Sequence, residues 1–575
     1  MQKPFYILGI NTTYHELSAV LIKDGDLVAA VEEERFTRIK HGKKALIDNP
    51  DVLPKEAMAF CLKKAGIGLA DLDRIGISFH PENRLKNINA DKYFVEGDWG
   101  SKSGEELFYK KIQTIPNLLS EHAGVDLESK CVWVPHHVSH AGSAYYVSPF
   151  AESAVLSIDG IGETTSTWLG VGNGKKMSLI KEVEYPNSIG FFWEKLSKFL
   201  GFSEYDAAKV MGLASYGNKS KYHDAFKKLV VLKSDGGFEV DSDTLRFRVE
   251  DYEPLEKLFG VKKLNNPDER EKAHEDIAAG LQAITDDVFM NIAGYLAKET
   301  GSKNICLAGG VALNCVSNFK VMQSGLFEGM YVQPAAHDAG TALGAAYYLW
   351  HEREAKERQF TMSHAFWGPD YSESEIEKVL KDAGVKYEKL QNIEQATAQA
   401  IADGKIVGWF QGKMEWGPRA LGNRSLLVDP RDMGMKEILN IRIKKRELFR
   451  PFAPSVLAED ASEWFEMPTG CASISFEFME FALPVVDEKR KLIPAVTHVD
   501  GTSRIQVVRN EVNPKYHKLI SEFKKITGVP MVLNTSFNDN EPIVCSPEDA
   551  VKTFVRTKMD YLSIGDFLVS KGAEQ

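Results

Sequence analysis

Three histidines within five residues, His136, His137 and His140, are the first sign of chemistry in the sequence. The run that follows them is apolar and helix-like, so the spacing of four places His136 and His140 on one helix face, where both imidazoles can share a metal ion. Asp159 and Asp338 follow separate predicted strands and add carboxylate ligands. Two imidazoles and two carboxylates suit iron(II), manganese or zinc, with positions open for a substrate oxygen. An isolated His-x-x-x-His pair is also explained by two hydrogen-bonded histidines at a helix start.

His15 lies in a polar bend between two predicted strands. Because histidine titrates near neutrality, His15 could accept the proton of an attacking hydroxyl, although a surface turn explains the same residue. Lys40 stands ahead of a glycine in a segment, residues 32–42, that changes from acidic to basic. Such a segment is usually a solvated face, and Lys40 is nevertheless a candidate for binding phosphate.

Basic residues concentrate in the second part of the chain. Arg419 stands among glycines in a segment that leaves a predicted strand, and residues 442–450 include Lys444 and Arg450. In an acidic protein this concentration indicates an anionic ligand, and the mixture of Arg forks with Lys point charges favours a phosphorylated small molecule plus a nucleotide. A solvated basic helix is the alternative for part of this segment. The polar residues 534–538 form either a ligand-facing loop or a capping turn.

The composition excludes several classes of protein. The chain has 575 residues and a formal net charge of −11, which argues against a general nucleic-acid binder. No apolar run approaches the length of a membrane span, and the apolar stretch near the N-terminus is too short for a signal peptide. The six cysteines include no Cys-x-x-Cys pair that would indicate zinc or a redox centre. We therefore expect a cytoplasmic protein with neither a nucleic-acid nor a membrane partner.

One arrangement of predicted strands occurs twice. Residues 6–31 read as strand, polar bend, strand, turn and strand, and residues 154–183 repeat the pattern about 150 residues later. Gly160 and Gly162 stand in the second bend, where small residues let backbone N–H groups approach an anion. A single hairpin of this kind is common, but the duplication is typical of the actin-like ATPase superfold.

The elements that follow complete a nucleotide cleft in the prediction. A short strand ends in Gly309 and Gly310, which permit close approach of a flat ring, and a helix-like run carries Asn314. The charged stretch 351–358 is interpreted as a helix end and linker. The prediction is therefore a first domain over residues 1–358 and a second α/β domain over 359–575.

These segments together resemble the carbamoyltransferase family that includes the nodulation protein NodU and antibiotic-tailoring O-carbamoyltransferases, and the resemblance covers nearly the whole chain. It rests on nine motifs in order: Leu8-Gly9 with His15, Glu33-Glu34-Arg35-Phe36, His136-His137-x-x-His140, Asp159-Gly160-x-Gly162-Glu163, Lys209-x-Met211-Gly212-Leu213-Ala214, Ala308-Gly309-Gly310, Gly417-Pro418-Arg419-Ala420-Leu421-Gly422-x-Arg424-Ser425, Arg450-Pro451-Phe452-Ala453-Pro454 and Asn534-Thr535-Ser536-Phe537-Asn538.

The resemblance implies a fold and an activity. The fold would be a duplicated actin-like (ASKHA) domain similar to the tRNA threonylcarbamoyl transferase, followed by an α/β domain similar to the YrdC carbamoyl-adenylate synthases. In the second domain, carbamoyl phosphate would lose its phosphate, and the carbamate would attack the α-phosphate of ATP to give carbamoyl adenylate and pyrophosphate. In the first, metal-containing domain, the carbamoyl group would pass to a hydroxyl of a small-molecule acceptor. A homodimer is compatible with this reading.

The resemblance also implies residue roles. The implied metal ligands are His136, His140, Asp159 and Asp338, with iron(II) as the first expectation and manganese or zinc as alternatives. The implied catalytic residues are His15, which would assist the acceptor hydroxyl, and Lys444. The implied nucleotide-binding residues are Lys40, Gly160, Gly162, Lys209, Gly212, Gly309, Gly310, Asn314, Arg419 and Asn534. The implied ligands of carbamoyl phosphate are Lys444, Arg450 and Arg504. The loop 537–542 departs from the family pattern, because it lacks the glycine that relatives often place before Glu-Pro.

Three other functions compete with this one. An actin-like sugar kinase would leave the histidine cluster and the basic second domain without a role. A tRNA-modifying transferase of the threonylcarbamoyl type should show a basic footprint, against which the charge of −11 argues. A nucleotide-binding regulator or chaperone would not release pyrophosphate. The acceptor is not readable from the sequence, but residues 81–112 and 231–272 carry no recognised motif and are candidates for shaping its site.

Overall fold

The computed structural model describes residues 3–571, which group by their contacts into two compact units. The first unit contains the chain up to residue 37, residues 41–362 and the short segment 470–473. The second contains residues 363–469 and the chain from 474 onward, together with residues 38–40. Lys40 therefore groups with the second unit although it lies near the N-terminus in sequence. The division at residue 358 stays a prediction.

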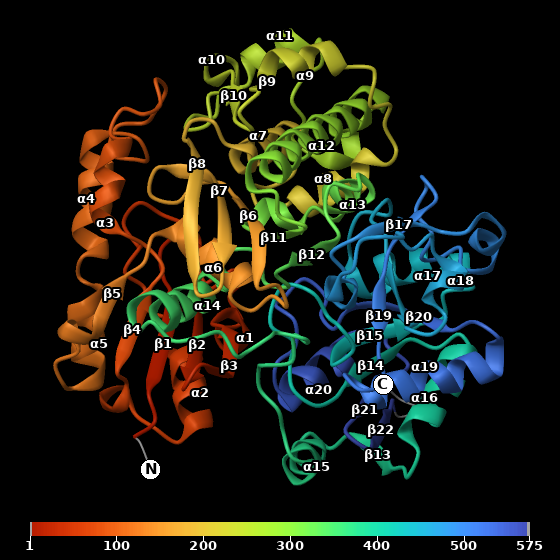
Figure 1. The fold of residues 1–575 in the computed structure, drawn as a ribbon. Helices are drawn as coiled ribbons and strands as arrows, with labels where there is room; N and C mark the ends of the chain where they lie inside the picture. The colour runs from red at the N-terminus through yellow and green to blue at the C-terminus, as the bar shows by residue number, and fades with distance from the viewer. Residues whose placement is uncertain (1–2, 572–575) are drawn as a thin grey trace. The chain divides into compact units, whose positions relative to one another are not determined.

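The first unit is built on two five-stranded sheets of the same topology (Figure 1). The strands of the first sheet, in the order β3-β2-β1-β4-β5, are β1 (Tyr6–Asn11), β2 (Ser18–Lys23), β3 (Asp26–Glu32), β4 (Arg74–Ile77) and β5 (Cys131–Trp133). Those of the second, in the order β8-β7-β6-β11-β12, are β6 (Glu152–Ile158), β7 (Thr165–Asn173), β8 (Lys176–Glu184), β11 (Asn304–Ala308) and β12 (Gly329–Val332). In each sheet the first three strands pair antiparallel, the fourth pairs in parallel with the first, and the fifth pairs in parallel with the fourth. The predicted duplicated α/β fold is confirmed.

Helices surround these two sheets. They are α1 (Glu34–Thr37), α2 (Lys55–Ala65), α3 (Pro81–Arg84), α4 (Lys102–Ile112), α5 (Ile115–Ala123), α6 (His136–Tyr145), α7 (Ile189–Phe199), α8 (Ala207–Ala214), α9 (His223–Leu229), α10 (Ser242–Leu245), α11 (Glu253–Phe259), α12 (Lys272–Thr300), α13 (Cys315–Gln323) and α14 (Ala339–Tyr348). A short hairpin of β9 (Val230–Leu232) and β10 (Phe238–Val240) lies beyond α9.

Helices α6 and α14 lie side by side in Figure 1, and small residues bring them together. A Cβ added at Gly344 would lie 1.6 Å from the backbone oxygen of Ser139, so only glycine permits this contact. The glycine- and alanine-rich sequence of α14 thus places its N-terminus, which carries Asp338, against the helix that carries the histidines.

The second unit is a mixed α/β structure, as predicted. Its eight-stranded sheet, in the order β13-β22-β21-β14-β15-β20-β16-β19, contains β13 (Lys386–Lys389), β14 (Val407–Phe410), β15 (Arg424–Val428), β16 (Ala453–Leu457), β19 (Gln506–Val508), β20 (Met531–Ser536), β21 (Tyr561–Ile564) and β22 (Phe567–Ser570). A small sheet pairs β17 (Ala482–Pro484) with β18 (Thr502–Arg504). The helices are α15 (Glu373–Asp382), α16 (Ile393–Ala402), α17 (Met433–Ile438), α18 (Ala461–Trp464), α19 (Pro514–Thr527) and α20 (Pro547–Arg556). The likeness of this unit to the YrdC carbamoyl-adenylate synthases stays a prediction.

Within residues 3–571, no helix combines the length and the apolar character that crossing a bilayer requires.

Candidate functional site

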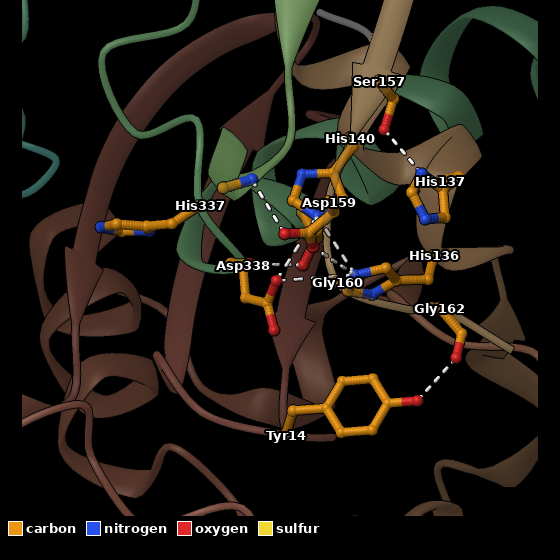
Figure 2. A network of polar contacts seen from close by, with 12 residues as sticks. Tyr14, His136, His137, His140, Ser157, Asp159, Gly160, Gly162, His337 and Asp338 are labelled. Atoms are coloured by element: carbon orange, nitrogen blue, oxygen red, sulfur yellow. Dashed lines mark hydrogen bonds and ion pairs between the residues drawn. The ribbon is translucent and has the colours of Figure 1, made fainter. Parts of the chain in front are cut away.

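Four side chains of the first unit direct their ligand atoms toward one point (Figure 2). The Nε2 atoms of His136 and His140 lie 3.1 Å apart, and Asp159 Oδ2 lies 3.5 and 3.1 Å from them. Asp338 Oδ1 lies 3.5 Å from His136 Nε2 and 3.4 Å from His140 Nε2. A tetrahedron with such edges has its centre about 2 Å from each corner, which is the usual bond length from histidine nitrogen or carboxylate oxygen to zinc. The four residues therefore fit a transition-metal ion.

Each of these side chains is positioned by the element that carries it. The spacing of four places both histidines on one face of α6, where their side chains are fully buried. Asp159 follows the last residue of β6, and its Oδ1 accepts a hydrogen bond from Gly310 N at 3.0 Å, which leaves Oδ2 for the histidines. His137 points away from the cluster, because its Nδ1 lies 2.8 Å from the hydroxyl of Ser157 (Figure 2).

The charges of the four side chains shift one another's pKa values. Burial by itself lowers the pKa of His136, but the carboxylates of Asp338 and Asp159 outweigh it and raise that pKa to about 10. Burial raises the pKa of Asp159, and hydrogen bonds to His136 and His140 more than reverse this, so the pKa lies well below the usual value. A cation at the centre would compensate the same carboxylates, which agrees with the fit of a metal ion.

Three glycines predicted to contact a nucleotide pack closely against other residues of the first unit, and their role in nucleotide binding stays a prediction. A Cβ at Gly162 would lie 3.0 Å from His136 Cβ, and one at Gly310 would lie 2.8 Å from Asp159 Oδ1. Gly309 has φ +92, and a Cβ there would lie 2.1 Å from the backbone oxygen of Ile158. Their lack of a side chain is thus required by the protein itself. A Cβ at Gly160, by contrast, would meet no atom within 4 Å, so space is open over that residue.

The remaining nucleotide-binding candidates of this unit have partners in the protein. Asn314 is the N-cap of α13, where its Oδ1 accepts from Ser317 N, and its amide also exchanges hydrogen bonds with Gln282. The Lys209 ammonium lies 3.1 Å from Asp206 Oδ1. Gly212 lies within α8. Their role in nucleotide binding stays a prediction.

His15 acts electrostatically on the metal-ligand cluster, because it lowers the pKa of Asp338. Burial and Asp159 raise the pKa of Asp338, but His136 and His15 lower it, and the net pKa is below the usual value. The His15 side chain is 31% exposed, and its Nδ1 lies 3.9 Å from Glu16 Oε1. The position therefore suits a group that exchanges a proton with a bound substrate.

Lys444 of the second unit lies at the end of a π-helical turn, Leu439–Lys444, and is 2% exposed. Its ammonium donates to the backbone oxygen and hydroxyl of Ser536 and to the backbone oxygen and Oδ1 of Asn538. Burial first, and then Arg446 and Arg450, lower the pKa of Lys444 well below its usual value. These contacts hold Ser536, the last residue of β20, and Asn538, two residues beyond it, and the direct binding of carbamoyl phosphate by Lys444 stays a prediction.

Several cations of the second unit lie close enough to lower one another's pKa values, and we treat them as one group. The pKa of Arg446 is lowered well below its usual value by burial first and then by Arg450 and Arg504, against the opposing effect of Glu447, and Lys40 lowers the pKa of Lys444 in the same way. Sequence reasoning treated Arg446 only as part of a basic run. No sequence signal separates Arg446 from this run; in the structure Arg442 and Lys445 are exposed, whereas the Arg446 guanidinium lies 4.5 Å from the centroid of the Phe452 ring.

Arg419 stands at the tip of a loop that a single carboxylate holds together. Glu415 Oε1 accepts hydrogen bonds from the backbone N–H groups of Leu421, Asn423 and Arg424. The Nε of Arg419 is buried without a hydrogen-bond partner within the described chain. Glu415 is a structural residue that the sequence did not reveal, because its three acceptor contacts are to backbone atoms.

Arg424, from the same motif, has a different environment. Its guanidinium is fully buried, lies 3.6 Å from the centroid of the Phe410 ring and donates to five backbone oxygens. Arg424 therefore organises the fold, and the role of Arg419 in nucleotide binding stays a prediction.

Asn534 lies on β20 and is 2% exposed. Its Nδ2 donates to Ala420 O, Ser455 Oγ and Gln506 Oε1, and its Oδ1 has no hydrogen-bond partner within residues 3–571. The amide thus ties the Arg419 loop to the sheet.

The loop 537–542, whose course the sequence did not imply, is held by Asn538, since Asn538 Nδ2 donates to Glu541 O at 2.7 Å.

Comparisons with known proteins agree with these two halves. The family model for the carbamoyltransferase N-terminus matches residues 6–347, and that for the carbamoyltransferase C-terminus matches residues 398–571. Nodulation protein NolNO of Sinorhizobium fredii is 39% identical over 566 residues, which cover 98% of this chain and 80% of that protein. The 3'-hydroxymethylcephem-O-carbamoyltransferase of Streptomyces clavuligerus is 31% identical over 338 residues, 58% of this chain and 59% of that protein. The structure of (R)-2-hydroxyglutaryl-CoA dehydratase component A of Acidaminococcus fermentans aligns with a TM-score of 0.32 and 18% identity over 61% of this chain and 100% of its own. The resemblance predicted from the motifs is confirmed: this chain is an enzyme and belongs to the carbamoyltransferase family.

Proposed function

We propose that this carbamoyltransferase uses ATP and carbamoyl phosphate to carbamoylate a hydroxyl of a small-molecule acceptor through carbamoyl adenylate. The observation that carries the proposal is the group of mutually repelling cations in the second unit, Arg446, Arg450 and Arg504 above all. Glu447, 4.0 Å from Arg450, and Glu480 offset part of this positive charge, and carbamoyl phosphate and ATP are polyanions that would offset more of it. The cephem relative acts, by its name, on a hydroxymethyl oxygen, which supports a hydroxyl acceptor.

The proposed chemistry has three steps. Hydrolysis of carbamoyl phosphate gives carbamate and inorganic phosphate. A carbamate oxygen then attacks the α-phosphorus of ATP, the bond to the β-phosphate bridge breaks, and pyrophosphate leaves. The acceptor oxygen finally attacks the carbamoyl carbon, AMP leaves with the electrons of the broken C–O bond, and the hydroxyl proton passes to a base. Free carbamate decomposes readily in water, so its immediate capture as the adenylate favours keeping both early steps in one water-poor site.

In this scheme the second unit carries the phosphate chemistry. Arg419, Arg450 and Arg504 would bind the phosphate groups, because arginine binds oxyanions through paired N–H donors. Lys444 would act through the loop that its ammonium holds, by fixing Ser536 and Asn538. Lys40 would add a positive charge to the same group.

The first unit would carry the transfer. His136, His140, Asp159 and Asp338 would hold one divalent metal ion, with iron(II) favoured over manganese or zinc only by the family resemblance. Such an ion, when bound, supplies Lewis-acid polarisation of a substrate oxygen. His15 would accept the hydroxyl proton of the acceptor, since it is partly exposed and lies within electrostatic reach of Asp338.

One assay tests the proposal as a whole. The purified chain is incubated with ATP, with and without carbamoyl phosphate, and pyrophosphate is measured. Release that requires carbamoyl phosphate is expected, and candidate sugars, aminoglycosides and polyketides added to the mixture should gain the mass of one carbamoyl group. Pyrophosphate release that is independent of carbamoyl phosphate, or phosphate transfer from ATP to a sugar, would contradict the adenylate route.

A further inference from the structure

Four aromatic residues of the first unit surround an arginine, and we call this group the aromatic–arginine cluster: Trp99, Tyr185, Phe191, Phe247 and Arg248. The guanidinium carbon of Arg248 lies 4.6 Å from the ring centroid of Phe191, 4.8 Å from Tyr185 and 5.8 Å from Trp99. Tyr185 is buried, whereas the other four side chains are partly exposed. The cluster therefore presents both ring surface and a cation to solvent.

Within the described residues no carboxylate forms an ion pair with Arg248, although Glu194 lies within its electrostatic reach. Among residues 3–571, no Asp or Glu oxygen lies within 4.0 Å of its guanidinium, and its Nε is buried without a hydrogen-bond partner. Other arginines nearby are paired: Arg246 with Asp251, and Arg84 with Glu105 at 2.6 Å. The Tyr185 hydroxyl interacts with the guanidinium of Arg248, and the N–H groups that remain match the oxygens of a carboxylate, sulfate or phosphate group.

The cluster adjoins the metal-ligand residues in two ways. The ring centroid of Tyr14 lies 5.9 Å from that of Trp99 and 6.0 Å from that of His136. The Tyr14 ring therefore separates the aromatic–arginine cluster from the metal-ligand residues. Tyr14 and His136 are both drawn in Figure 2. Phe191 lies in the first turn of α7, and the residue before it, Gly190, donates its N–H to Asp159 O at 3.3 Å. A ligand on the cluster would therefore lie next to the proposed transfer site.

Three of the five residues of the cluster come from the two segments in which the sequence shows no family motif. Trp99 belongs to residues 81–112, and Phe247 and Arg248 belong to residues 231–272. Tyr185 and Phe191 flank the start of α7 and supply the surface between them, with Tyr185 and Phe191 centroids 5.6 Å apart and Phe191 and Phe247 centroids 5.9 Å apart.

We propose that the aromatic–arginine cluster is the acceptor-binding site. Arg248 would select acceptor molecules in which an oxyanion lies beside an apolar face of the acceptor's own ring. This inference rests on the proposed function, because it names the class of acceptor for that transfer. The oxyanion can be a carboxylate, a sulfate ester or a phosphate ester, since all three present the oxygens that the guanidinium edge recognises. The partly exposed rings of Trp99 and Phe247 would cover the uncharged part of the molecule.

Calorimetric titration tests this with matched probes. Glucose is the neutral member, and glucuronate, a glucose sulfate ester and a glucose phosphate ester are the anionic members that separate the three sources of oxyanion. The wild-type chain should bind at least one anionic probe about ten- to hundredfold more tightly than glucose, the range expected for hydrogen bonds to a charged group. Arg248→Gln should abolish this preference. Arg248→Lys should keep part of it, because an ammonium retains the charge without the fork.

Arg246→Gln is the matched control, since Arg246 lies two residues away, stacks on Tyr93 at 4.5 Å and already pairs with Asp251. It should bind all four probes as the wild type does. The inference is overturned if the wild-type chain shows no preference for any anionic probe, or if the preference survives unchanged in Arg248→Gln and Arg248→Lys. Pyrophosphate release by the wild-type chain reports separately on the proposed function, so the two failures can be told apart.

Discussion

Replacing Lys444 by methionine tests whether this residue acts through the loop it holds. Methionine keeps much of the length and the apolar stem but removes the ammonium, which donates to two atoms of Ser536 and two of Asn538. Hydrogen bonds to a charged group contribute about 1.5–3 kcal/mol, and the burial of Lys444 leaves no water to replace them. If the loop must keep its place for adenylate formation, that loss corresponds to about a ten- to hundredfold fall in rate.

The assay is carbamoyl-phosphate-dependent pyrophosphate release, measured for Lys444→Met, Asn538→Ala and the double variant. Two substitutions that break the same contact should not add, so the double variant should lose little more than Lys444→Met alone. Arg442→Met is the control, because Arg442 is an exposed cation of the same π-helical turn. Undiminished release in Lys444→Met would refute a role for Lys444, and fully additive losses would refute the loop as the route of its effect.

Three further predictions concern the metal, the base and pH. His140→Ala should lower bound metal, measured by elemental analysis, at least tenfold, whereas His137→Ala, whose ring faces Ser157 from the same helix, should keep it; equal metal in both would contradict the assignment. His15→Asn should spare pyrophosphate release and slow acceptor carbamoylation by about 10²–10⁴, the contribution of general-base assistance, and unchanged carbamoylation would exclude His15 as the base. Burial raises the pKa of Glu480 to about 8 against the opposing effect of Arg419 and Arg504, so the folded chain binds a proton that the unfolded chain releases. Stability should therefore fall between pH 5 and 8, and Glu480→Gln should flatten that fall in denaturation curves; the same slope in the variant would show that Glu480 is not the group responsible.

Local sequence patterns were sufficient to predict the duplicated sheets. They also predicted that the two histidines and two aspartates of the metal-ligand cluster lie close together. Strand alternation and glycine turns act over a few residues, and His136 and His140 share a helix face because of helical geometry alone. Asp159 and Asp338 each follow a strand or precede a helix of a repeated topology, so their convergence follows once the duplication is recognised.

Contacts over long sequence distances were not predictable in this way. Nothing near Lys40 in sequence indicates that it groups with the second unit, and nothing near Trp99 indicates that it meets Arg248. Gly162 and Gly310 could be read as contacts for a ligand because a missing side chain looks the same whether a nucleotide or another part of the protein fills the space. Sequence reveals that a close approach occurs there, and only the fold reveals what approaches.

The arginines of this chain divide into two physical classes, and the division bears on which of them can bind substrate. Arg424 donates to five backbone oxygens and Arg84 pairs with Glu105, so binding a ligand would require breaking those contacts. Arg446 donates its Nε to Asn440 Oδ1 at 2.8 Å, and burial together with Arg450 and Arg504 lowers its pKa against the opposing effect of Glu447. An anion bound beside Arg446 would attract its guanidinium and would also offset the repulsion from Arg450 and Arg504. Both effects would increase the affinity for the anion. In the proposed function, phosphate groups bound beside these cations would therefore stabilise the second unit by compensating positive charge beyond what Glu447 provides.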